Sequence, residues 1–146
     1  MGAPTSKTPL LVELRIRIKT YDIDFVGHVN NIVYIRWLED LRLEFLDAHL
    51  PLGPLQEQGI APIVVSTNIH YRQGIILSDE HVLGRMWISE MQRASFFLGA
   101  EFVVDGEVKC SATQRGTLID TSRNRPIRIP AHLREAFTKD FEASEK

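Results

Sequence analysis

Residues 21–31 bring together two aspartates, a glycine, a histidine and two asparagines, in the sequence YDIDFVGHVNN. This segment has no periodicity, so we predict a loop. From Asn30 onward the apolar residues recur at three- and four-residue spacing, which predicts a long helix that ends near Leu50. The carboxylate of Asp24 is therefore expected just before a helix N-terminus.

A carboxylate beside a helix start suits acyl transfer. The first backbone amides of a helix have no partner inside it and lie at its partially positive end. Such amides can donate to a thioester carbonyl and stabilise the developing oxyanion, a contribution of about 3 kcal/mol per donor. The carboxylate of Asp24 can attack the carbonyl or activate a water. The simpler alternative, favoured by spacing alone, is that the Asp and Asn residues only cap the helix.

The surrounding patterns predict the elements that position this loop. Residues 11–19 alternate between apolar and charged side chains, as in a half-buried strand. Further strands are predicted at residues 63–72, 81–90, 94–104 and 107–119, with a hairpin turn at Asp105 and Gly106 and a short helix at residues 130–137. The order of elements predicts an α+β fold, with the long helix on the apolar face of an antiparallel sheet. The opposite face is polar and rich in small side chains, so either solvent or another subunit could cover it.

Composition limits the classes of function. The length of 146 residues predicts a single domain over residues 1–146, with flexible ends at 1–9 and 142–146. A net charge of -2 argues against a nucleic-acid partner. The single cysteine, Cys110, is expected to be a buried filler. There is no apolar run of about 20 residues for a membrane span and no signal peptide pattern, so we expect a cytoplasmic protein. The chemistry needs no metal and no cofactor.

Residues 21–31, with Tyr34, Glu39 and Arg42, resemble the signature of the 4-hydroxybenzoyl-CoA thioesterase family. The resemblance implies the hotdog fold, a long central helix wrapped by a five-stranded antiparallel sheet, over residues 10–120. It implies that Asp24 is the catalytic carboxylate and that the backbone amide of Asn31 polarises the thioester carbonyl. The stretch from Gly27 to Asn31 is also similar to fatty-acyl thioesterases, including plant acyl-carrier-protein thioesterases. This favours a fatty acyl group, on CoA or acyl-carrier protein, over an aromatic one.

Five further residues are expected to bind substrate or shape the site: Gly27, His28, Asn30, Tyr34 and Ser95. His28 could be a base, but the family varies at this position, which favours a turn residue. Asn30 is the expected helix N-cap. Tyr34 could line the acyl pocket or pack in the core. Ser95 follows a segment similar to the family's turn into its fourth strand, where a serine often lies near the site.

Two other acids are alternatives to Asp24. Asp22 is interpreted as an exposed loop residue. Glu39 is a rival because some hotdog thioesterases carry their carboxylate on the long helix. It lies more than two turns past the helix start, however, and an i,i+3 ion pair with Arg42 explains it more simply.

The substrate and the family suggest further features. A CoA ligand would call for basic side chains, and most of the arginines available for it can equally be solubilising: Arg72, Arg93, Arg115, Arg123, Arg125 and Arg128. The acyl chain is expected between the long helix and the sheet. Because the family forms dimers and tetramers with sites at subunit boundaries, we expect a homodimer or homotetramer.

Two other functions stay open. Hydration or dehydration of acyl thioesters, found in other hotdog proteins, is disfavoured because the Asp-x-Asn-x-x-His sequence is absent. A non-catalytic acyl-thioester-binding or regulatory module is disfavoured by the presence of both Asp24 and Gly27.

Overall fold

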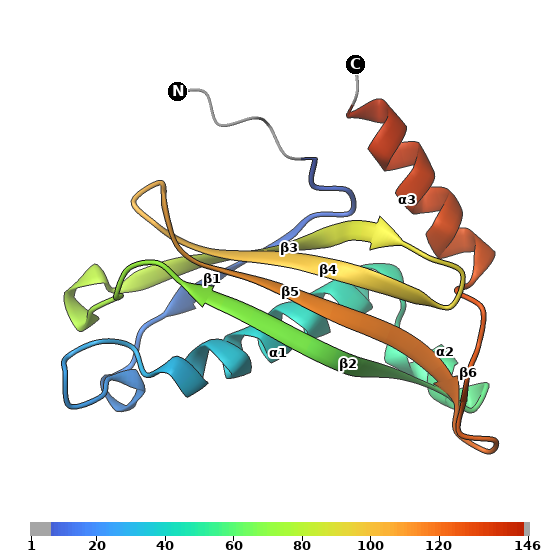
Figure 1. The fold of residues 1–146 in the computed structure, drawn as a ribbon, viewed down its shortest axis with the longest axis horizontal. Coiled ribbons are helices and arrows are strands. Elements are labelled where there is room, and N and C mark those ends of the chain that lie inside the picture. The colour runs from blue at the N-terminus through green and yellow to red at the C-terminus, as the bar shows by residue number, and fades with distance from the viewer. Residues whose placement is uncertain (1–6, 145–146) are drawn as a thin grey trace.

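The computed structural model describes residues 7–144, in which one antiparallel sheet wraps around a long helix (Figure 1). The helices are α1 (Asn31–His49), α2 (Leu52–Glu57) and α3 (Ala131–Ala143). The strands are β1 (Val12–Arg17), β2 (Ile60–Tyr71), β3 (His81–Met91), β4 (Ser95–Val104), β5 (Glu107–Asp120) and β6 (Arg125–Pro126). The sheet order is β1-β3-β4-β5-β2, with β6 paired only to β5. The predicted α+β arrangement is confirmed.

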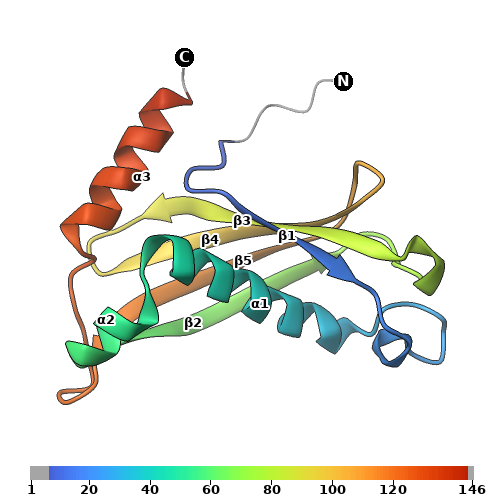
Figure 2. The ribbon, with the colours of Figure 1, turned by 180° about the vertical axis from the view of Figure 1, so that it is seen from behind.

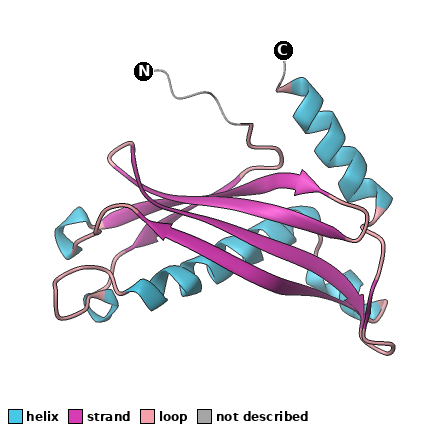
Figure 3. Cartoon of the chain, in the orientation of Figure 1, coloured by secondary structure: helices cyan, strands magenta, loops and turns pink. Residues whose placement is uncertain are grey.

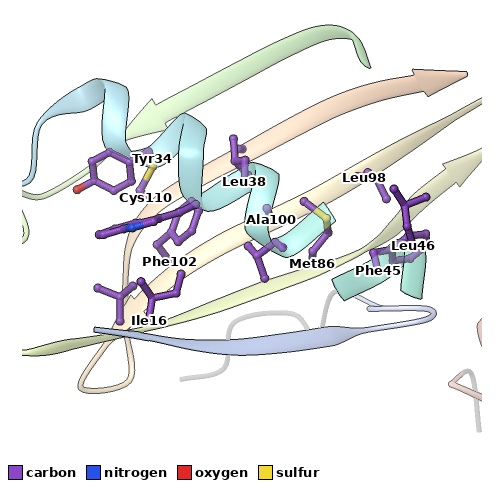
Figure 4. Packing of buried hydrophobic residues seen from close by; sticks show 14 of the residues in the cluster. Ile16, Tyr34, Leu38, Phe45, Leu46, Met86, Leu98, Ala100, Phe102 and Cys110 are labelled. Carbon is purple, nitrogen blue, oxygen red and sulfur yellow. The ribbon is translucent and has the colours of Figure 1, made fainter. Parts of the chain in front are cut away.

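The core lies between α1 and the concave face of the sheet, and both sides follow the sequence pattern (Figure 4). The inward side chains of β4 are buried at every second position from Phe96 to Val104. Those of α1 are buried at three- and four-residue spacing from Val33 to Leu46. Fully burying one such side chain contributes about 2 kcal/mol, so this periodicity fixes which face of α1 meets the sheet.

Aromatic rings fill the space beneath the first turns of α1. Tyr34 makes edge-on contacts with Trp37, Tyr71 and Phe102, with ring centroids 5.3, 5.2 and 5.6 Å away. Cys110 is fully buried, as predicted, and burial raises the pKa of its thiol to about 12. Its thiol therefore stays protonated at neutral pH and is a poor nucleophile.

The sequence patterns placed several boundaries wrongly. The predicted loop after α1 contains α2, because Pro51 and Pro54 lie at its N-cap and first turn, where a missing N–H costs no helical hydrogen bond. β2 begins at Ile60 rather than residue 63, since Pro62 is tolerated in an edge strand. The sheet has a sixth strand, the two-residue β6, where five were predicted. The hairpin at Asp105-Gly106 is confirmed, with φ values of 50° and 77°.

α3 lies on the side of the sheet opposite α1 (Figures 2 and 3). It extends to Ala143, past the predicted end at residue 137. The predicted flexible ends fall partly outside the described residues, at 1–6 and 145–146. In the described part of the first end, the carbonyl of Pro9 accepts from the Ile88 amide at 3.0 Å. The next residue, Leu10, donates its amide to Asp140 at 2.7 Å. In residues 7–144, no helix is long and apolar enough to span a membrane.

Candidate active site

The loop before α1 holds the Asp24 carboxylate by its own backbone. Oδ1 of Asp24 accepts hydrogen bonds from the amides of Val26 at 3.0 Å and His28 at 3.2 Å. The Asp24 amide donates to the His28 carbonyl at 2.8 Å, and the Gly27 amide to the Asp24 carbonyl at 3.0 Å. Gly27 has a φ of +93°, which a residue with a side chain adopts only under strain. The loop thus fixes one carboxylate oxygen, while Oδ2 has no donor among residues 7–144.

One amide at the start of α1 is free to bind a ligand. The Ile32 amide donates to the side chain of Asn30 at 3.1 Å, which confirms Asn30 as the N-cap. The Val33 amide donates to the Asn30 carbonyl at 2.9 Å. The amide of Asn31, an exposed residue, has no acceptor in the described part of the chain. A helix-start donor for a carbonyl oxygen is therefore present next to the Asp24 loop.

Asp24 and Asn31 line a surface hollow of about 210 Å³. Its wall comes from the end of β2 and the segment after it: Tyr71, Arg72, Gln73 and Gly74. Of these, the sequence pointed only to Arg72, as one of six arginines available to CoA. The Val29 amide joins the loop to this wall through a 2.8 Å bond to the Ile75 carbonyl. His28 and Tyr34 also line the hollow.

Tyr34 belongs to both the core and the hollow. Its side chain is only 2% exposed, and its ring lies within the aromatic cluster of α1 and the sheet. Burial raises the pKa of its hydroxyl well above the ordinary value, with smaller contributions from Cys110 and Tyr71. Tyr34 therefore stays neutral, and the two roles left open by the sequence are compatible.

Tyr71 connects the wall of the hollow to the helix start. Its hydroxyl donates to the carbonyl of Asn31 at 3.1 Å. Burial raises the pKa of this hydroxyl too, so it remains a donor at neutral pH. The first peptide of α1 is thereby held from β2, forty residues along the chain.

Asp22 is not the exposed loop residue that we predicted. It is 6% exposed, and its Oδ2 accepts from the Lys19 amide at 2.9 Å. Its carbonyl accepts from the Asn30 amide at 2.9 Å. Asp22 therefore closes a short 3-10 turn and attaches it to the helix cap, which is a structural role.

Glu39 forms the predicted ion pair with Arg42, with a contact of 2.6 Å to its Oε2. Arg42 also donates to Gln114 at 3.3 Å, and the buried Gln114 donates to Thr67 at 3.1 Å. Eight residues separate Glu39 from Asn31, about 12 Å along the helix at about 1.5 Å per residue. Glu39 is thus occupied by a polar network away from the hollow.

Ser95 lies at the other end of the sheet. It pairs with Thr117 of β5, whereas Tyr71 beside the hollow pairs with Cys110. Those two β5 positions are about 23 Å apart at about 3.3 Å per residue. Its hydroxyl donates to Gln92 at 2.7 Å. Within one chain Ser95 is therefore not brought to Asp24.

Residues 7–144 of one chain enclose no acyl-sized pocket between α1 and the sheet, where the sequence analysis expected one. Aromatic rings fill this space near the hollow, and a slot farther along, between Leu46 and Ile63, has a volume of only about 10 Å³. Exposed apolar side chains instead surround Asp24 at the surface. Phe25 is fully exposed, at 101%, and Val26 is 61% exposed.

A long helix wrapped by an antiparallel sheet is the hotdog fold. The chain belongs to the thioesterase-like superfamily, whose family model matches residues 18–137. It is a thioester hydrolase.

Relatives agree with this assignment. The long-chain acyl-CoA thioesterase FadM of Escherichia coli (strain K12) is 26% identical over 126 residues, 85% of this chain and 95% of that protein. The crystal structure of YbaW, a probable thioesterase from Escherichia coli, matches with a TM-score of 0.77 and 26% identity, over 85% of this chain and 94% of that one. BH1999, a gentisyl-coenzyme A thioesterase, matches with a TM-score of 0.75 and 25% identity, over 86% and 99%.

Proposed function

We propose that this chain hydrolyses an acyl-CoA to the free acid and CoA, using Asp24 and the backbone amide of Asn31. The observation that carries the proposal is the free Asn31 amide beside a carboxylate whose Oδ1 is fixed and whose Oδ2 has no donor among residues 7–144. The amide would donate to the thioester oxygen as negative charge develops there. The position of Asp24 suits attack on the neighbouring carbonyl carbon.

Two mechanisms of hydrolysis are consistent with these positions. Asp24 can attack the carbonyl carbon and expel the thiolate, after which water hydrolyses the mixed anhydride. Alternatively, Asp24 takes a proton from a water that attacks directly, and the thiolate then leaves. Both give one carboxylic acid and one thiol. Incorporation of ¹⁸O from labelled water into Asp24 during turnover would distinguish the anhydride route from the direct one.

A fatty acyl group is the substrate class that we favour. The apolar side chains of Tyr21, Phe25 and Val26 are 74%, 101% and 61% exposed around the Asp24 loop, a surface suited to a hydrocarbon chain. FadM is named for long-chain acyl-CoA, which agrees, whereas BH1999 is named for an aromatic acyl group. Both fatty and aromatic acyl-CoAs are therefore needed as test substrates.

We also propose that the protein forms a homodimer through the edge of β2, with a homotetramer as the next assembly. β2 is an edge strand of the sheet, and its Ile63 and Val65 are 40% and 53% exposed. An uncovered edge strand with apolar side chains is a pairing surface. Two-fold pairing would cover the β2 edge of both subunits at once. A cytoplasmic location stays a prediction.

The test is thiol release from short, medium and long fatty acyl-CoAs and from aromatic acyl-CoAs. The variant Asp24→Asn keeps the shape of the loop but removes the charge, and Asp40→Asn, on the exposed side of α1, is the matched control. We expect a loss of roughly a hundredfold or more in kcat for Asp24→Asn and none for Asp40→Asn. Full turnover in Asp24→Asn would contradict the assignment. If the protein binds CoA esters and carrier-protein esters but hydrolyses neither, it is a binding module.

A further inference from the structure

The wall of the hollow that faces Asp24 carries hydrogen-bond donors with no partner of their own. Arg72 and Gln73 line this wall, next to the free backbone amide of Asn31. The guanidinium of Arg72 forms no ion pair and no hydrogen bond with any group in residues 7–144. A saturated hydrocarbon chain offers such donors no acceptor, and shielding them from water without one carries a cost. The hollow is therefore matched to an acyl group that carries an oxygen.

The backbone holds Arg72 beside the start of α1. The Arg72 amide donates to the Lys109 carbonyl at 2.9 Å, which extends the pairing of β2 with β5. The preceding residue, Tyr71, donates its hydroxyl to the Asn31 carbonyl at 3.1 Å. Figure 1 shows the end of β2 beside the first turns of α1. A group bound by Arg72 must therefore lie close to the thioester carbonyl that the Asn31 amide would hold.

The charge of Arg72 is felt on the inner side of the sheet. Burial raises the pKa of the Cys110 thiol, and the positive charge of Arg72 opposes this rise with a smaller effect. Cys110 is part of the buried core that packs against α1. Charges in bulk water are screened over short distances, so this effect agrees with a guanidinium at the hollow rather than one that extends into solvent.

The side chain of Gln73 is oriented by Lys109. Its Oε1 accepts from Nζ of Lys109 at 2.6 Å, which uses the acceptor end of the amide. Its Nε2 donates to no acceptor in the described part of the chain. The wall thus presents a guanidinium and an amide as donors, while the loop opposite presents Oδ2 of Asp24 as an acceptor.

We propose that Arg72, assisted by Gln73, selects acyl groups with an oxygen on the third carbon, so that 3-oxoacyl and 3-hydroxyacyl thioesters are preferred over unsubstituted fatty acyl ones. The inference rests on the proposed function and specifies its acyl group. In a 3-oxoacyl group the two carbonyl oxygens can point to the same side. The Asn31 amide then accepts the thioester oxygen as its partner, and the guanidinium of Arg72 donates to the second oxygen.

The carboxylate of Asp24 limits the charge of this acyl group. Its Oδ2 has no donor among residues 7–144, so a second carboxylate in the hollow would be repelled. A neutral oxo or hydroxyl oxygen accepts a charge-assisted hydrogen bond from Arg72 without that repulsion. The remainder of the chain can lie on the exposed apolar side chains of Phe25 and Val26. These features together favour a 3-oxo fatty acyl group over a dicarboxylic one.

The test compares octanoyl-CoA, 3-hydroxyoctanoyl-CoA and 3-oxooctanoyl-CoA, which differ only at the third carbon. We expect wild type to prefer the 3-oxo ester over octanoyl-CoA by about tenfold or more in kcat/KM. Arg72→Ala should remove this preference by a loss on the 3-oxo ester, with octanoyl-CoA within about twofold of wild type. Arg72→Lys should retain part of the preference, and Gln73→Ala should lose less of it. Arg15→Ala, at an exposed residue of the opposite edge strand β1, is the control for one lost charge.

Equal losses on all three esters in Arg72→Ala would overturn the proposal, because Arg72 would then act on a part that the esters share, such as the pantetheine arm. A wild-type enzyme without preference among the esters would overturn it as well. Calorimetric binding to Asp24→Asn separates this inference from the catalytic role of Asp24. The 3-oxo ester should bind about tenfold more tightly than octanoyl-CoA, and addition of Arg72→Ala should abolish the difference. Equal affinities for the two esters would contradict the role of Arg72, whereas retained turnover in Asp24→Asn would contradict only that of Asp24.

Discussion

The imidazole ring of His28 occupies the space that a side chain at Gly74 would need. A Cβ built on Gly74 would lie 2.8 Å from two atoms of the ring, closer than real Cβ contacts. The loop that holds Asp24 is therefore packed directly against the segment after β2. This contact joins the two halves of the hollow and makes the position of the loop depend on the end of the sheet.

The first prediction is that Gly74→Ala reduces activity by displacing the His28 loop. Overpacking costs about 1–3 kcal/mol. If the displaced loop raises the free energy of the transition state by a similar amount, kcat/KM falls by about tenfold or more. Gly53→Ala is the control, because a Cβ on Gly53 meets nothing within 4 Å. Steady-state kinetics and thermal unfolding of both variants provide the measurement. Unchanged kinetics in Gly74→Ala would show that the contact does not position the loop.

The second prediction concerns the bond from Tyr71 to the Asn31 carbonyl. Tyr71→Phe keeps the ring packed on Tyr34 but removes a hydrogen bond of about 1 kcal/mol. Because this bond holds the first peptide of α1, we expect kcat to fall about fivefold with little change in KM. Thr138→Val, which removes a 3.0 Å hydroxyl hydrogen bond within α3 on the opposite side of the sheet, should behave as wild type. A change confined to KM would assign Tyr71 to substrate binding instead.

The third prediction tests whether His28 acts as a base or as a turn residue. Its backbone amide, not its ring, supports Asp24 Oδ1 at 3.2 Å. A side-chain replacement that keeps the backbone should therefore leave most of the activity. We expect His28→Gln to retain kcat within about threefold, whereas loss of a general base costs about a hundredfold or more. A pH–rate profile of this variant that loses one limb would contradict the turn interpretation.

Local periodicity was sufficient to predict α1, four of the main strands closely and the cap at Asn30, because these features depend on residues near one another in sequence. Asp24 and Asn31 were named from the family resemblance, and both line one hollow because a single loop and the helix start after it contain them. Tyr71 and Gly74 were missed because only the pairing of β2 with β5 brings them to the loop. The burial of Asp22 likewise depends on the packing of its turn against the start of α1.

A surface cavity at the start of α3, lined by Arg93, Arg128 and Arg134, illustrates the same limit. Arg93 and Arg128 were among six arginines considered from sequence, with nothing to distinguish them from surface charges. Arg134 was not considered, because it lies in a segment where only a short helix was predicted. The three meet because the Arg93 carbonyl accepts from both Ile129 and Arg134. A backbone contact of this kind has no signature in side-chain spacing.

The last prediction is a loss of stability in mild acid that depends on His49. This residue is in the last turn of α1, with its ring 4.7 Å from that of Phe45, and its Nε2 is buried without a hydrogen-bond partner in residues 7–144. Burial lowers the pKa of His49 below 6.5, against weaker opposing effects of Leu10 and Asp140. The folded chain therefore binds this proton less tightly than the unfolded chain does.

The sign of the effect follows from linkage. The neutral ring contributes its full stability above pH 6.5, the ordinary value, and the contribution is lost as the pH falls from there through the lower pKa of the folded state. We expect the free energy of unfolding in urea to fall between pH 7 and pH 5 more steeply in wild type than in His49→Gln. His132→Gln, at an exposed residue of α3, should follow wild type. If His49→Gln showed the same slope as wild type, the acid sensitivity would have to come from the carboxylates instead.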